Sequence, residues 1–226
     1  VDVLLLNAVG VDGPAEDGWA PGNVHFLDAP PECVMGGNGG SGAYLLGRLG
    51  NRVSLNTRVG ADVYGAKLSD WFSEACVDVM GPPALRTAVN TILFGNDGAR
   101  RSYYYTGEKV DWGVSLDAEG GDWMYASGYG QVTSGDLETL TGIFRKARAT
   151  GARVVFDPGP WFMQVASTVQ MLAAWRQPDC LIGTEDELAA RRPEEDIEAL
   201  VSGLLGDGAS RVVVKRGGQG AAFGEA

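Results

Sequence analysis

The sequence contains one histidine, His25, and three cysteines, Cys33, Cys76 and Cys180. Ser-His-Asp and Cys-His catalysis need an imidazole, and zinc sites need several histidines or cysteines, so this composition argues against all of them. The cysteines are odd in number, far apart and without a C-x-x-C pair, which argues against a disulfide framework. We therefore expect a reducing, cytoplasmic location and expect carboxylates, backbone amides or a cofactor to carry any catalysis.

Positive charge is also scarce, because 18 Lys and Arg residues face 29 Asp and Glu residues and the net charge is −11. Binding to nucleic acid or to an anionic membrane surface needs clustered cations, which the sequence does not show. No apolar run approaches the roughly 18 residues of a membrane-spanning helix, and the N-terminus lacks the basic flank of a signal peptide. We expect neither a nucleic-acid partner nor a membrane partner.

Glycine, in contrast, is abundant: 34 of the 226 residues are glycine, about twice the usual share. Such a chain makes tight turns or lets its backbone approach a ligand closely. The length and the 45% hydrophobic content predict a folded protein of one domain, over residues 1–226.

Segments typical of strands alternate with segments typical of helices, and this rhythm predicts a parallel sheet covered by helices. The apolar run 1–9 predicts a buried strand of that sheet, and G-N-D-G at 95–98 predicts a hairpin outside it. We expect further strands over 23–27, 32–35, 52–59, 89–94, 101–105, 123–126, 153–156, 180–182 and 211–214, and helices over 43–49, 64–75, 136–150, 162–175, 185–191 and 194–205.

The glycine-rich segment 36–42 lies between a predicted strand and a predicted helix, where backbone N–H groups commonly bind a ligand. Gly37, Gly39 and Gly42, with Asp62 about 20 residues later, formally match the dinucleotide-binding fingerprint. That fingerprint needs a long buried strand directly before the first glycine, so an NAD(P)-dependent oxidoreductase is the least favoured alternative. Close packing of a helix on a sheet is the other explanation of the glycines.

Several polar residues each allow two interpretations. Asp12 ends the first predicted strand and is either a ligand contact or a turn residue, whereas Asp62 is better explained as a helix cap than as a ligand contact. The acids at 185–187 are typical of a solvated first turn of a helix. The segment 217–220 forms either a hairpin or a backbone surface for a nucleotide.

Several motifs follow one another in a recognisable order: G-G-N-G-G-S-G-A from residue 36, R-L-G from 48, V-G-A-D-V-Y-G from 59, V-F-D-P from 155, T-E-D-E from 184 and V-V-V-K-R-G from 212. In this order the chain resembles the PfkB/ribokinase family of carbohydrate kinases. The resemblance implies an α/β fold, a ribokinase-like three-layer α/β/α sandwich with a mostly parallel central sheet. It also implies a small β lid, here from about 20–35 and 87–106, through which two copies form a homodimer.

The implied activity is transfer of the γ-phosphoryl group of ATP, with Mg²⁺, to a hydroxyl of a small sugar or nucleoside-like substrate. Carried over residue by residue, the resemblance assigns Glu187 to the organisation of Mg²⁺. It assigns substrate binding to Asp12, Gly36, Gly37, Asn38, Ser41, Asn90 and Tyr103, and nucleotide binding to Thr184, Lys215, Gly217 and Gly220.

The chain departs from the family pattern in several places. Family members carry a D-T-x-G-A-G-D stretch that contains the catalytic Asp, and the sequence reaches Ala226 without it. We therefore expect no catalytic base within these residues and a fragment of a kinase, the alternative being a catalytically inactive sugar- or nucleoside-binding protein. Thr184 stands where the family has Asn, and Lys215 where Thr is frequent.

Overall fold

The computed structural model describes residues 2–7, 30–94, 100–117, 121–192 and 196–226. The chain divides into two compact units, Val1–Glu108 and Lys109–Ala226, and each is described by itself. Asp12, the strand predicted over 23–27 and the turn predicted at 95–98 lie outside the described residues. In the described part of the chain, no helix combines the length and the apolar composition needed to cross a membrane.

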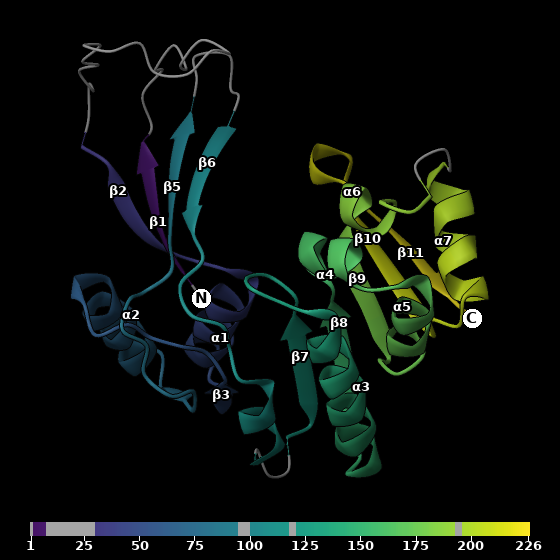
Figure 1. Ribbon diagram of the computed structural model, residues 1–226, viewed down its shortest axis with the longest axis horizontal. Helices are drawn as coiled ribbons and strands as arrows, with labels where there is room; N and C mark the ends of the chain where they lie inside the picture. The colour runs from purple at the N-terminus through teal and green to yellow at the C-terminus, as the bar shows by residue number, and fades with distance from the viewer. Residues whose placement is uncertain (1, 8–29, 95–99, 118–120, 193–195) are drawn as a thin grey trace. The chain divides into compact units, whose positions relative to one another are not determined.

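A four-stranded sheet with the order β2-β1-β5-β6 forms the first part of unit 1 (Figure 1). Strand β1 (Asp2–Asn7) runs parallel to β5 (Val89–Phe94) and antiparallel to β2 (Glu32–Gly36), and β6 (Arg100–Tyr105) pairs antiparallel with β5. The strands predicted over 32–35, 89–94 and 101–105 are confirmed. The first strand, predicted for the parallel core, instead lies between the two segments predicted to form a lid, and the lid role itself stays a prediction.

The rest of unit 1 packs two helices on a short parallel strand pair. Helix α1 (Asn38–Arg48) and helix α2 (Val63–Glu74) accompany β3 (Val53–Leu55) and β4 (Val77–Val79). The buried core of this part consists of Ala43, Leu68, Phe72, Ala75 and Val77.

Helix α1 begins earlier than the predicted start at 43, because the glycine-rich segment is mostly helical rather than a loop. Gly37 is the residue before the helix and has φ 76°, a left-handed conformation that glycine adopts without strain. Gly40 is buried, whereas a Cβ on Gly39 would make only an ordinary contact, 3.9 Å from Leu55 Cδ1. Both explanations of these glycines, close packing and ligand binding, stay predictions.

Asp62 caps helix α2 and ties it to the residues before β5. Its Oδ1 accepts hydrogen bonds from Gly65 N at 2.9 Å and from Thr87 Oγ1 at 2.7 Å, and its Oδ2 accepts one from Thr87 N at 3.0 Å. Burial raises the pKa of Asp62, but the donors from Thr87 and Gly65 outweigh burial, so the pKa is lowered below 3.8. The cap interpretation of Asp62 is correct.

We expect Asp62→Ala to lower the free energy of unfolding by about 1–2 kcal/mol at neutral pH, because it removes a helix cap. Since the pKa of Asp62 is lowered in the folded state, its contribution is fully present above the unfolded-state pKa and is lost progressively as the pH falls through the folded-state pKa. Urea unfolding of both proteins at pH 7 and pH 3 measures this. A stability difference that is as large at pH 3 as at pH 7 contradicts the prediction.

The second unit is built on a five-stranded sheet with the order β11-β10-β9-β8-β7. Strands β7 to β10 are parallel, and β11 pairs antiparallel with β10 at the edge. Their bounds are β7 Trp123–Ser127, β8 Arg153–Asp157, β9 Cys180–Thr184, β10 Arg211–Lys215 and β11 Ala221–Glu225. Every strand predicted in this half of the sequence is confirmed, and β11 shows that 217–220 joins two strands of a hairpin.

The helices of unit 2 follow the predicted order with one break. The bounds are η1 Trp112–Asp117, α3 Ser134–Ala149, α4 Gly159–Val165, α5 Thr168–Trp175, α6 Glu185–Leu188, α7 Ile197–Gly206 and η2 Gly217–Gln219. The single helix predicted over 162–175 is wrong, because Ala166 is extended and Ser167 starts a new helix through a capping box with Gln170. A serine directly before a helical run with Gln at the third helical position is the signal for that break.

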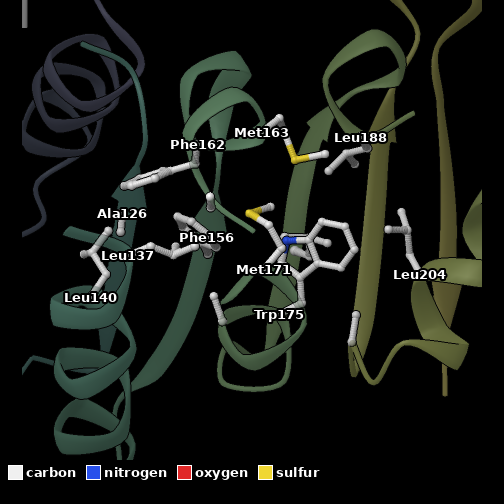
Figure 2. Close-up of a cluster of buried hydrophobic side chains, with 14 of the residues drawn as sticks. Ala126, Leu137, Leu140, Phe156, Phe162, Met163, Met171, Trp175, Leu188 and Leu204 are labelled. Atoms are coloured by element: carbon white, nitrogen blue, oxygen red, sulfur yellow. The ribbon is translucent and has the colours of Figure 1, made fainter. Parts of the chain in front are cut away.

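The core of unit 2 surrounds strand β8 (Figure 2). Phe156, fully buried on this strand, contacts Phe144 of α3 and Phe162 of α4, with ring centroids 5.2 Å and 6.1 Å away. Alternate residues of the strand point to opposite faces, so this packing fixes the direction of the next residue, Asp157. The core therefore holds in place the end of the strand where the polar residues lie.

Candidate functional site

Polar side chains gather where the parallel strands of unit 2 end. Ser127, Asp157, Thr184 and Lys215 are the last residues of β7, β8, β9 and β10. In the strand registers Ser127 lies beside Asp157, and Thr184 beside Lys215. Ligands of open α/β sheets bind at this edge, so the four residues mark a candidate site.

Asp157 and Lys215 form an ion pair at the centre of this edge. Lys215 Nζ lies 3.0 Å from Asp157 Oδ2, and Gly159 N donates to Asp157 Oδ1 at 3.1 Å. The Asp157 side chain is only 1% exposed, whereas that of Lys215 is 38% exposed. Burial raises the pKa of Asp157, although the Lys215 ammonium opposes this shift. The pair thus presents a half-exposed cation anchored on a buried carboxylate.

Glu187 lies next to this pair, in the first turn of α6. Thr184 N donates to Glu187 Oε2 at 2.8 Å and Glu187 N donates to Thr184 Oγ1 at 3.3 Å, which forms a capping box. Tyr129, after β7, donates its hydroxyl to Glu187 Oε1. Burial raises the pKa of Tyr129, and the negative charges of Glu187 and Asp157 raise it further. Threonine at position 184 thus replaces asparagine and still caps the helix.

The hairpin at the end of β10 leaves part of its backbone uncovered. Gly217 and Gly220 have φ 55° and 83°, and in the described structure a Cβ at either would meet no heavy atom within 4 Å. Beside them, Arg216 Nε lies 3.0 Å from Glu185 Oε2. The hairpin interpretation is correct, and the role of this backbone as a surface for a nucleotide stays a prediction.

The residues predicted to bind substrate lie in unit 1. Gly36 ends β2, Gly37 precedes α1, and Asn38 and Ser41 lie in its first turns, so these four are together. Asn90 lies on β5 and Tyr103 on the neighbouring strand β6, where its side chain is 48% exposed. The buried Oδ1 of Asn90 has no hydrogen-bond partner among the described residues.

Of the predicted nucleotide and metal residues, the structure brings together Thr184, Glu187 and Lys215. Sequence reasoning assigned no role to Asp157 or Tyr129. Asp157 follows a buried strand and precedes proline, which is a usable signal. Tyr129 lies 58 residues from its partner Glu187, and no spacing in the sequence reveals that contact.

The donor set fits a magnesium ion shared with phosphates better than a cage made of protein alone. Among the described residues, no group of three or more His, Cys, Asp and Glu side chains is placed to hold a metal ion. Mg²⁺ usually keeps several waters and binds one or two carboxylates together with substrate phosphates. The Glu187 carboxylate is suited to that kind of site.

A family model described as "pfkB family carbohydrate kinase" matches residues 11–226. The chain belongs to this family. A search of curated proteins found no match.

Solved structures of kinases share the fold at low identity. The ribokinase of Thermotoga maritima is 19% identical with a TM-score of 0.72, the match covering 99% of this chain and 71% of that one. The ATP-bound fructokinase of Xylella fastidiosa is 20% identical with a TM-score of 0.66, covering 99% and 74%. The tetrameric inhibited form of phosphofructokinase-2 from Escherichia coli is 20% identical with a TM-score of 0.68, covering 100% and 73%. The pfkB chain described here therefore has the ribokinase-like α/β fold with a mostly parallel sheet.

Proposed function

We propose that this pfkB protein is a sugar kinase that transfers the γ-phosphoryl group of ATP to a hydroxyl of a small carbohydrate. The observation that carries the proposal is the cluster at the carboxyl edge of the unit 2 sheet. There an ammonium group, a buried carboxylate and an open glycine backbone lie together, which suits a nucleotide with its metal ion. Family membership supports the sugar as the acceptor.

The nucleotide-binding roles follow from the chemistry of each group. Lys215 donates charge-assisted hydrogen bonds to phosphate oxygens, and the backbone at Gly217 and Gly220 lies along the nucleotide. Thr184 holds the start of α6, and with it Glu187, at the sheet edge. When bound next to Glu187, Mg²⁺ neutralises charge on the phosphates.

The sugar-binding roles belong to the residues predicted in unit 1. The carboxylate of Asp12 accepts hydrogen bonds from sugar hydroxyls, and the amides at the start of α1 donate to them. Asn90 offers an acceptor with no partner among the described residues, and Tyr103 offers an exposed phenol. The substrate-binding set also includes Gly36, Gly37, Asn38 and Ser41.

In the transfer, the sugar hydroxyl oxygen forms a bond to the γ-phosphorus as the bond to the ADP oxygen breaks, and the hydroxyl proton passes to a base. The family places that base in a D-T-x-G-A-G-D stretch, which these 226 residues do not contain. The residues named above bind and orient the two substrates. Catalysis of this kind depends chiefly on positioning and on stabilising phosphoryl charge.

A panel of sugars assayed with ATP and Mg²⁺, beside calorimetric titration of each sugar, tests the proposal. We expect turnover with at least one sugar from a chain that contains the D-T-x-G-A-G-D stretch, and binding of that sugar without turnover from these 226 residues. We also expect Asp12→Ala to weaken binding of that sugar by about tenfold or more, because a charged acceptor is lost. Sugar binding without turnover by the longer chain, under any metal condition, supports the inactive binding protein instead. Binding of neither sugar nor nucleotide contradicts both.

We also propose a homodimer through the lid strands. Tyr103 and Tyr105 of β6 are 48% and 54% exposed, on the same face of the strand. Exposed aromatic side chains are common in protein interfaces. Sedimentation of the protein over a range of concentrations measures the oligomeric state, and a monomer throughout contradicts this part of the proposal.

A further inference from the structure

Two helices of unit 2 begin with the same capping arrangement around an acid, but the two acids have different partners. At α3, Asp136 completes the capping box with Thr133, and its Oδ1 forms an ion pair with Lys109 at 2.7 Å. At α6, Glu187 completes the box with Thr184, and its second oxygen accepts a hydrogen bond from the neutral hydroxyl of Tyr129. Helix capping alone does not require this second partner.

The charge of Glu187 is therefore held in place without being neutralised. The residue is only 8% exposed and has no ion-pair partner in the described part of the chain. The nearby cation, Lys215, forms an ion pair with Asp157. The negative charges of Asp157 and Glu187 also repel each other across this edge of the sheet. A buried carboxylate without a counterion is costly, so the site gains free energy when a cation enters it.

Tyr129 is itself placed by close backbone packing. Gly128 N donates to Asp157 O at 2.7 Å, and a Cβ on Gly128 would lie 2.1 Å from Pro158 O. The Tyr129 ring lies against Gly159, where a Cβ would be 3.0 Å from ring atom Cδ2. Glycine at both positions lets the segment after β7 lie close to the end of β8, with the phenol next to Glu187.

We propose that Tyr129 is a positioning residue, which orients the Glu187 carboxylate toward the Mg²⁺ of the bound nucleotide while leaving its charge free for that ion. This inference rests on the proposed kinase function and extends it to a residue outside the recognised motifs. It predicts that removing the Tyr129 hydroxyl reduces the gain in nucleotide affinity that Mg²⁺ provides. The nucleotide affinity without metal should stay the same.

The test compares ATP binding by calorimetry in excess Mg²⁺ and in EDTA, for the unaltered protein, Tyr129→Phe and Tyr64→Phe. Tyr129→Phe keeps the ring that packs on Gly159 and removes only the hydroxyl. We expect the gain in affinity from Mg²⁺ to fall by about tenfold, the size of a hydrogen bond to a charged group. The affinity in EDTA stays within about twofold. Tyr64→Phe removes a hydroxyl from a partly buried tyrosine of α2 in unit 1, to which no binding role is assigned, and leaves both values unchanged.

A second pair of variants keeps the result interpretable. Glu187→Gln removes the charge, and we expect it to lose the Mg²⁺ gain; adding Tyr129→Phe to it should then change nothing further. If Tyr129→Phe retains the full Mg²⁺ gain, or weakens binding equally in Mg²⁺ and EDTA, the positioning role is overturned while the kinase proposal stands. If the unaltered protein gains nothing from Mg²⁺, the proposed function itself fails.

Discussion

Replacing Lys215 by alanine is expected to weaken ATP binding by about ten- to hundredfold, the value of a charge-assisted hydrogen bond to phosphate. The same change is expected to lower the free energy of unfolding of unit 2. Asp157 is 1% exposed and would lose the ammonium partner of its Oδ2 while keeping the hydrogen bond from Gly159 N. Removing one partner of a fully buried pair costs about 3–5 kcal/mol, but the ammonium is partly solvated, so we expect about 1–3 kcal/mol.

The loss of stability in Lys215→Ala should depend on pH. Burial already raises the pKa of Asp157 above its usual value of 3.8, and without the ammonium the pKa rises further. A carboxyl whose folded-state pKa is raised binds its proton more tightly when folded, so stability falls as the pH rises from the unfolded-state pKa to the folded-state pKa. Urea unfolding should therefore show a smaller deficit at pH 4 than at pH 8.

The double variant Lys215→Ala with Asp157→Asn separates the two effects. Asn keeps the shape of Asp157 and an acceptor for Gly159 N but carries no charge, so most of the stability should return. ATP affinity should stay low, since the ammonium is still absent. If the double variant recovers ATP affinity, Lys215 does not bind phosphate, and a deficit that is equal at both pH values contradicts the electrostatic account.

The sequence predicted the strands and the order of elements well because each rests on local patterning. Buried strands such as 153–156 follow from apolar runs, and the hairpin partners 89–94 and 101–105 follow from alternating residues beside turn signals. Two of the errors also have local causes. The prediction began a helix at residue 43, after glycines that lie within α1, and it overlooked the serine cap that divides α4 from α5.

The site was predictable only as far as its motifs are contiguous. Thr184 and Glu187 are three residues apart and form one capping box, so their association follows from the spacing. The contacts of Tyr129 with Glu187 and of Lys215 with Asp157 each join residues 58 positions apart. Such contacts depend on the strand order of the sheet, which periodicity does not determine. Long-range pairs were therefore the part of the site that needed the structure.

Gly47→Ala is expected to destabilise unit 1 by about 1–3 kcal/mol or more, because overpacking a tight contact forces the backbone to move. A Cβ at Gly47 would lie 2.2 Å from Ala75 O and 3.2 Å from Val77 Cγ2, where α1 packs against the end of α2 and β4. A backbone carbonyl cannot rotate away as the end of a flexible side chain does. The close approach of α1 to these elements therefore depends on glycine at this position.

Gly42 of the same helix provides the matched control. A Cβ there meets no heavy atom within 4 Å among the described residues, so Gly42→Ala should raise the free energy of unfolding by about 0.5–1 kcal/mol through helix propensity. Urea unfolding of both variants measures the contrast. Two stabilising substitutions would show that α1 does not need its close approach at Gly47. If Gly47→Ala lowers the free energy of unfolding and Gly42→Ala raises it, packing requires glycine at position 47. The stability of the unit then tolerates a side chain at position 42.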